Sequence, residues 1–293
     1  MPTTYAVPNG RTEMAATLWT GNGTSQTINN ASNGVSFAPD FVWLKYRNSG
    51  SNSNNLFDVI RGATKHLFSN STAAEGTNAQ ALTAFTSTGF SVGNDNDVNQ
   101  SSGTYVGWQW KGGGTGVSNT AGSITSTVSA NTTAGFSVVT WTAPASTGTH
   151  TVGHGLGVAP SMIIAKSRSG GSGGLGWAVY FTTLGNSAGL ALNTTAASFS
   201  SSNYWGSSNP TSTVFGLNDA ASATGYDNNT GNMVAYCFAA VAGYSAFGSY
   251  TGNGSVDGPF VYCGFRPAFI LYKRSSDAGN SWRITDSTRS TYN

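Results

Sequence analysis

The chain has 293 residues and a formal net charge of +2, and only 8% of its residues are charged. Because no run of Lys or Arg is longer than two residues, the dense cationic surface that binds a nucleic-acid backbone is not expected. An aromatic content of 12% argues against disorder, and no apolar run approaches the ~18 residues of a membrane span.

Residues 1–18 form the first predicted unit, an N-terminal arm that contains Pro2 and Pro8. The segment lacks a charged stretch followed by an apolar stretch, which is the pattern of a secretion signal. We therefore expect a protein that is made in a cytoplasm without a secretion address. The arm is predicted to dock onto a larger particle, with a plain disordered tail as the alternative.

The predicted strands are short apolar alternations bounded by Gly, Asn, Ser and Thr. In the segment FAPDFVWLKYR (37–47), residues 41–44 are apolar on both faces, as expected for a central strand. In a later strand, Val106, Trp108 and Trp110 share one face, which we predict to be a core face. Because an apolar face needs a second layer, the sequence predicts an all-β fold of antiparallel two-sheet β-sandwiches, of jelly-roll or concanavalin A-like type.

The first of these strands occurs three times along the chain. It returns as VAPSMIIAKSR (158–168) and as FRPAFILYKR (265–274). The conserved spacing of other landmarks supports a tandem repeat, with 121 residues from Pro39 to Pro160 and 107 residues from Pro160 to Pro267. The predicted organisation is an arm followed by two complete repeats and the start of a third, over residues 1–18, 19–116, 117–243 and 244–293.

The third repeat stops at Asn293, about where the first repeat has reached Gly62. It therefore lacks a counterpart of the strand over 104–110. Half of a sandwich is not expected to fold alone. Either the chain continues past Asn293, which is the favoured interpretation, or a neighbouring molecule completes the third repeat.

Several segments carry a family resemblance, namely WTGNG and YTGNG, FAPDFVWLKYR, LFDVIRGATKHLFSN, GHGLGVAPSMIIAKSR and FGSYTGNGSVDGPFVYCGFRPAFILYKR. Together they resemble a repeat domain found in large virion proteins of marine tailed phages, including phages of cyanobacteria. The resemblance covers the chain from about Tyr5 onward. It implies a structural protein on the virion surface, a tail fibre, head fibre or capsid decoration. It also implies other virion proteins, further copies of the chain and host-surface glycans as partners, and it supplies no catalytic or binding residue.

A lectin-like protein or a glycan hydrolase on the same sandwich is the alternative function. Hydrolysis needs two closely placed carboxylates, yet the two glutamates, Glu13 and Glu75, lie in unrelated surroundings. The stretch 170–174 formally matches the G-x-S-x-G nucleophile elbow, but no helix is predicted after it. His154, between two glycines, is expected to pack in a turn with its ring hydrogen-bonded. We therefore predict that the chain is not an enzyme and needs no cofactor.

Two loops supply candidate ligand residues. Tyr204 and Trp205 lie in a polar loop without a counterpart in the first repeat, and an exposed aromatic pair of this kind is the predicted contact for a ligand. Asp95 and Asp97 place carboxylate oxygens close together in a turn, which Ca²⁺ would accept. The turn lacks the twelve-residue order of an EF-hand, so a solvated turn is the favoured interpretation and no metal is predicted to bind elsewhere.

Charged residues recur at matching places after the repeated strand. These are Lys45 and Arg47, Lys166 and Arg168, Lys273 and Arg274, then Asp58 with Arg61 and Asp286 with Arg289, where the second repeat has Phe181 and Leu184. The favoured interpretation is a salt-bridged sheet edge that discourages aggregation, and the alternative is a docking face for an acidic surface. The two cysteines, Cys237 and Cys263, are too few for a disulfide framework.

Overall fold

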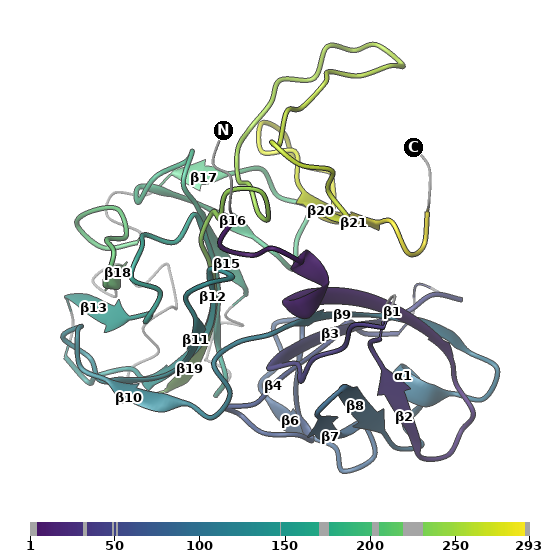
Figure 1. Cartoon of the computed structure of the whole chain (residues 1–293). Helices are drawn as coiled ribbons and strands as arrows, with labels where there is room; N and C mark the ends of the chain where they lie inside the picture. Colours follow the sequence, from purple (N-terminus) through teal and green to yellow (C-terminus); the bar gives the residue numbers. More distant parts are fainter. Residues whose placement is uncertain are drawn as a thin grey trace.

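The computed structural model describes residues 5–31, 34–48, 50, 52–146, 148–169, 176–200, 205–218 and 231–290. Its regular structure is almost entirely antiparallel β-sheet, which confirms the predicted all-β class. Within these residues the helical elements are single turns, η1 (Gly10–Thr12) and α1 (Asn96–Asn99). Figure 1 shows two sandwiches packed against each other, with the C-terminal hairpin lying beside both.

The first repeat consists of a large and a small sheet. The large sheet has the spatial order β1-β9-β3-β4-β5-β6, and its strands are β1 (Met14–Thr20), β3 (Phe41–Tyr46), β4 (Asn55–Asp58), β5 (Lys65–Phe68), β6 (Gly76–Thr77) and β9 (Thr104–Trp110). The small sheet has the order β2-β8-β7, with β2 (Gln26–Asn29), β7 (Leu82–Thr86) and β8 (Gly89–Val92).

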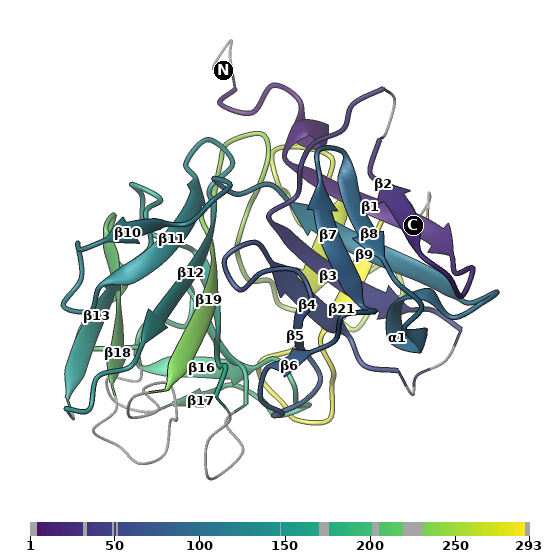
Figure 2. The same cartoon turned by 90° about the horizontal axis from the view of Figure 1, so that it is seen from below.

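The second repeat has the same strand order in its large sheet, β12-β19-β14-β15-β16-β17, and β11 and β10 extend this sheet beyond β12. The strands are β10 (Val117–Asn119), β11 (Ser126–Asn131), β12 (Phe136–Thr142), β14 (Met162–Ser167), β15 (Ala178–Phe181), β16 (Ala188–Ala191), β17 (Phe199–Ser200) and β19 (Asn232–Phe238). Its small sheet pairs β13 (Thr149–Gly153) with β18 (Val214–Asn218). Figure 2 shows this sandwich beside that of the first repeat.

The third repeat contributes one hairpin to the described residues, β20 (Phe269–Tyr272) and β21 (Arg283–Asp286). In cross-strand register, β20 and β21 correspond to β3 and β4, because Phe41 faces Asp58 and Phe269 faces Asp286. One predicted boundary is wrong. Strand β1 begins at Met14, so residues 14–18 belong to the large sheet of the first repeat and not to an arm.

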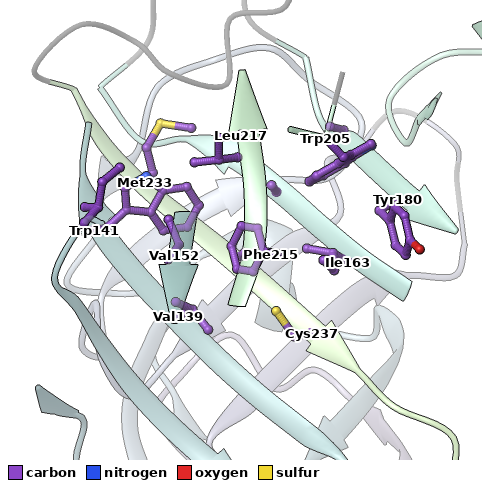
Figure 3. Close-up of a cluster of buried hydrophobic side chains, with 14 of the residues drawn as sticks. Val139, Trp141, Val152, Ile163, Tyr180, Trp205, Phe215, Leu217, Met233 and Cys237 are labelled. Atoms are coloured by element: carbon purple, nitrogen blue, oxygen red, sulfur yellow. The ribbon is translucent and has the colours of Figure 1, made fainter. Parts of the chain in front are cut away.

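Each of the first two repeats has an inner core between its large and its small sheet. In the second repeat Val152 and Phe215 from the small sheet meet Trp141, Ile163 and Cys237 from the large sheet (Figure 3). The first repeat uses equivalent positions, with Ile28 and Phe90 against Val42, Leu44 and Phe57. The predicted two-sheet sandwich is therefore present in both repeats.

A third core lies between the repeats and is the one that organises the molecule. Side chains alternate along β3, so that Val42 and Leu44 enter the inner core while Phe41 and Trp43 face the opposite way. The predicted core face of Val106, Trp108 and Trp110 also points away from the small sheet of its own repeat. It packs against the large sheet of the second repeat, in one cluster with Phe136, Ile164, Trp177 and Tyr236.

This shared core is completed by the third repeat. Phe269, Leu271, Trp282 and Ile284 of the hairpin pack against the same cluster. Burying one large apolar side chain contributes about 1.5–3 kcal/mol, so contacts of this number fix the repeats relative to one another. The repeats are therefore not independent modules joined by linkers. They pack around one common core.

Candidate functional site

Many charged and polar side chains of this chain lie at contacts between repeats, which we call corners. The first corner joins the first and second repeats, the second corner joins the second and third, and the third corner joins the third and first. At the first corner, Asp58 ends β4 and its carboxylate accepts hydrogen bonds from Arg61 Nε at 2.5 Å and from the Tyr236 hydroxyl at 2.9 Å. Arg61 Nη2 in turn donates to the Tyr236 hydroxyl at 3.1 Å. All three side chains are buried, so the first repeat holds the polar end of an aromatic side chain from the second repeat.

Glu75 extends this cluster across the same corner. Its carboxylate accepts from Arg61 Nη1 at 3.2 Å and from Arg168 Nε at 2.9 Å and Nη2 at 3.0 Å. Burial alone would raise the pKa of Glu75, but the two guanidinium groups hold it below its ordinary value. The carboxylate therefore stays ionised and joins an arginine of the first repeat to one of the second.

Backbone groups complete the first corner. Lys166 Nζ donates to the carbonyl of Thr72 at 3.0 Å, and Trp177 Nε1 donates to the carbonyl of Phe68 at 2.8 Å. The Glu75 amide donates to the carbonyl of Arg168 at 2.9 Å. Because Lys166 is buried, its pKa is lowered to about 8.

The second corner repeats this arrangement with equivalent residues. Phe68 in the first repeat and Ala191 in the second are equivalent. Phe68 pairs with Asn55, the first residue of β4, and Ala191 pairs with Ala178, the first residue of β15. Three contacts recur, from Lys273 Nζ to the carbonyl of Thr195 at 3.3 Å, from Trp282 Nε1 to the carbonyl of Ala191 at 2.9 Å, and from the Ser198 amide to the carbonyl of Ser275 at 2.9 Å.

The third corner returns from the hairpin to the first repeat. Trp108 Nε1 donates to Asp286 at 3.0 Å, and Arg289 Nε donates to the same carboxylate at 2.6 Å. The guanidinium of Arg289 also lies 5.0 Å from the centre of the Trp108 ring. Trp108 in β9 occupies the position of Tyr236 in β19. The Asp–Arg pair of the third repeat therefore binds an aromatic side chain of the first repeat, as the pair of the first repeat binds Tyr236 of the second.

Of the charged residues predicted to form salt bridges, Asp58 pairs with Arg61 and Asp286 with Arg289, but both pairs lie at contacts between repeats rather than at a sheet edge. Lys166 and Lys273 donate to backbone carbonyls instead. Tyr236 and Glu75 were not predicted to take part. Register could have indicated Tyr236, because it occupies the position of Trp108 and both rings carry a polar group. Ser198 occupies the position of Glu75 in the second repeat, so no repeated carboxylate marks Glu75.

A cavity of about 590 Å³ lies where all three repeats meet, and the second repeat contributes residues 192–195 to its lining. Its lining includes Trp43, Lys45 and Asn54 from the first repeat and Trp282 and Arg289 from the third. Lys45 occupies the position of Lys166 in the second repeat, and Asn54 occupies that of Trp177. At the other two corners, the side chains at these positions donate to backbone carbonyls of a neighbouring repeat. Asn54 Oδ1 is buried without a hydrogen-bond partner, and burial lowers the pKa of Lys45 although Asp97 opposes this.

The predicted aromatic contact site is not supported at Trp205. Its side chain is fully buried in the inner core of the second repeat, edge-on to the ring of Tyr180 at 5.9 Å between ring centres (Figure 3). The expectation of an exposed ring is wrong because the loop folds back, with the Trp205 amide donating to the Asn186 carbonyl at 2.9 Å. Tyr204 lies outside the described residues.

The acidic turn has a local structural role. Asp95 caps α1 by accepting from the Asp97 amide at 2.9 Å, and it also accepts from Asn78 at 2.7 Å. Asp97 accepts from Asn52 at 3.0 Å. In the part of the chain that the structure describes, no group of three or more His, Cys, Asp or Glu side chains could hold a metal ion. Calcium binding by Asp95 and Asp97 therefore gains no third acidic ligand from these residues.

The other candidate catalytic residues also have structural partners. Glu13 accepts from Asn131 at 2.6 Å, which joins the start of the first repeat to the second. His154 is buried, and its Nδ1 accepts from the Leu156 amide at 3.2 Å, as expected for a packed histidine. The predicted glycine-rich stretch 170–174 lies outside the described residues.

Comparison with known proteins gives one family. Residues 12–293 match a family described as a domain of unknown function, DUF7483. No match was found among curated proteins or among solved structures. No helix in the described ranges is long and apolar enough to cross a membrane.

Proposed function

The chain belongs to the DUF7483 family, and we propose that it is a structural protein on the surface of a tailed-phage particle, a fibre or a capsid decoration that aids attachment to the host. The observation that carries this proposal is how the buried and half-buried charged groups at the contacts between repeats are used. Asp58, Arg61, Glu75, Lys166 and Asp286 all join one repeat to another. Charged groups that bind neighbouring repeats to each other are more typical of a structural protein than of an enzyme.

The two glutamates argue in the same direction. A glycan hydrolase needs one carboxyl group that gives up a proton and a second that acts as nucleophile or base. Glu75 accepts from Arg168 through both oxygens, and the lowered pKa keeps it from acting as an acid near neutral pH. Glu13 is engaged by Asn131 and Thr12 in a different part of the first repeat.

Exposed apolar side chains on the third repeat support a role within an assembly. Between residues 250 and 270, the exposed large apolar side chains are Tyr250, Val256, Phe260, Val261, Tyr262 and Ile270. Where such side chains form a contiguous patch, they mark contacts with other proteins. Other virion proteins are the partners that the proposal implies, and repetition of the chain around a particle would add avidity for host glycans.

The proposal is tested by density-gradient fractionation of a lysate that contains the particles, with the chain followed by mass spectrometry. We expect sedimentation with intact particles at a fixed copy ratio. Hundreds of copies would indicate a decoration protein, and few copies would indicate a fibre. Recovery at the top of the gradient, in particular with binding to a glycan column, would reject the virion role in favour of a soluble lectin.

A further inference from the structure

Residues 5–13, which precede β1, pack across the link between the second and third repeats. They run from beside the second repeat to the start of β1 (Figure 1). The link, residues 239–245, follows β19 and contains no strand, and a single bridge between Val241 and Ser245 closes it into a turn. The link from β9 to β12, by contrast, contains β10 and β11. The N-terminal segment therefore lies at the junction where the connecting chain has the least structure of its own.

Two aromatic rings fit the N-terminal segment and the link to each other. The ring of Tyr5 lies so close to Gly243 that a Cβ atom added to this glycine would be 2.5 Å from the ring. In the opposite direction, a Cβ atom added to Gly10 would be 3.2 Å from the ring of Tyr244. Gly243 also has a φ of 77°, which favours glycine. Val7, between the two contacts, is only 5% exposed, so the segment is packed and is not a free tail.

Glu13 anchors the end of the segment that joins β1. Its carboxylate accepts a hydrogen bond from Asn131 of the second repeat at 2.6 Å. Burial raises the pKa of the Tyr244 hydroxyl, and the negative charge of Glu13 raises it further. Glu13 therefore lies near both the second repeat and the link, and Tyr244 stays neutral beside it.

The backbone hydrogen bonds of the two segments are local. The amides of Thr12 and Glu13 donate to carbonyls three residues earlier in their own segment, both at 3.1 Å. The amides of Tyr244 and Ser245 donate within the link to the carbonyl of Val241, at 3.0 and 2.9 Å. Segments held together by a few side-chain contacts open at a lower free energy than sheets do. The contact between the two segments can thus break while the hydrogen bonds of both sandwiches persist.

We propose that residues 5–13 form a clasp that opens and closes on residues 239–245 while both sandwiches stay folded. The closed clasp ties the start of the first repeat to the start of the third, beside the contacts of the third corner. The open clasp leaves the link to the third repeat mobile. An arm that docks onto a particle, as the sequence predicts for residues 1–18, has to leave the link first, and this consequence alone rests on the proposed function.

The first test is amide exchange of the whole unaltered chain, read at single residues. The amides of Thr12, Glu13, Tyr244 and Ser245 are hydrogen-bonded when the clasp is closed. We expect all four to exchange at least about 100-fold faster than the amides of β9 and β19, because a local opening exposes them. Protection equal to that of the two strands would overturn the proposal, since the clasp would then open only when the whole protein unfolds.

Substitutions test whether the ring of Tyr5 closes the clasp. Tyr5→Ala should speed exchange at Tyr244 and Ser245 by about 10-fold and leave β9 and β19 unchanged. The matched control is Tyr250→Ala, because Tyr250 is 57% exposed and Tyr5 is 45% exposed. Equal effects of the two substitutions, or faster exchange in every sheet after Tyr5→Ala, would contradict the clasp.

A double variant separates the contact from the strain of the turn. Gly243→Ala places a Cβ atom against the Tyr5 ring and also strains a backbone with positive φ. In the Tyr5→Ala background only the strain remains, so Gly243→Ala should speed exchange at Ser245 at least about 5-fold less than it does alone. Equal effects in both backgrounds would show that the ring does not close on this glycine. Exchange on the purified chain is independent of whether the protein sediments with particles.

Discussion

Asp58→Asn is the sharpest test of how the repeats hold together. The side chains of Asp58 and Arg61 are both 0% exposed, and the carboxylate accepts from the Arg61 amide, from Arg61 Nε and from the Tyr236 hydroxyl. The substitution removes the negative charge and turns an N–H group toward one of these donors. Removing one partner of a buried ion pair typically costs about 3–5 kcal/mol, since the remaining charge stays buried. Glu75, 3.2 Å from Arg61, retains part of the pairing, so we expect about 3 kcal/mol.

The chain contains a matched control for this substitution. Arg274 and Asp277 form an ion pair with the same spacing of three residues, but their side chains are 59% and 55% exposed. Asp277→Asn is expected to cost less than about 1 kcal/mol. Urea unfolding followed by tryptophan fluorescence gives both free energies of unfolding. Equal and small losses for the two variants would refute the claim that the buried pair stabilises the first corner.

Three further substitutions test other parts of the account by the same unfolding assay. Tyr236→Phe should cost about 1.5–3 kcal/mol because its hydroxyl bonds two charged groups, and a loss below 0.5 kcal/mol would contradict this. Trp108→Ala should cost about 3–5 kcal/mol and also speed amide exchange in β21, whereas an unchanged exchange rate would mean that the third corner is not held by this ring. Burial lowers the pKa of Lys166 to about 8, so the folded state loses this proton before the unfolded chain, whose value is 10.5. The stability of the unaltered protein should therefore rise between pH 8 and 10.5 by about 1–3 kcal/mol relative to Lys166→Met, and parallel pH profiles would reject this.

The strands were predictable because local patterns determine them. Residues 41–44 are apolar on both faces, and β3 is buried on both faces as expected. The partner of each face was not predictable in the same way. Alternation along the strand indicates that Trp108 faces a core, but the identity of the sheet that covers this face depends on contacts with residues of the other two repeats, such as Tyr236 and Phe269.

The candidate site shows the same limit. The pairing of Asp58 with Arg61 followed from spacing, whereas their burial depends on Tyr236, which belongs to another repeat. Trp205 was misjudged because a Ser-rich loop suggests exposure, while a tryptophan within it can fill a core that distant strands create. The sequence places Met14 in the predicted arm because the N-terminal segment alone gives no sign that Met14 pairs with Trp110.

The central claim is that the repeats share one core, and calorimetry tests it most directly. A globular protein absorbs about 0.7 kcal/mol per residue on unfolding near 60 °C, or about 200 kcal/mol for a chain of 293 residues. If the shared core couples the repeats, we expect a single transition whose van't Hoff enthalpy is close to this total. Two or more separate transitions with van't Hoff enthalpies near 70 kcal/mol, the value for about 100 residues, would show that the repeats unfold independently and would contradict the account.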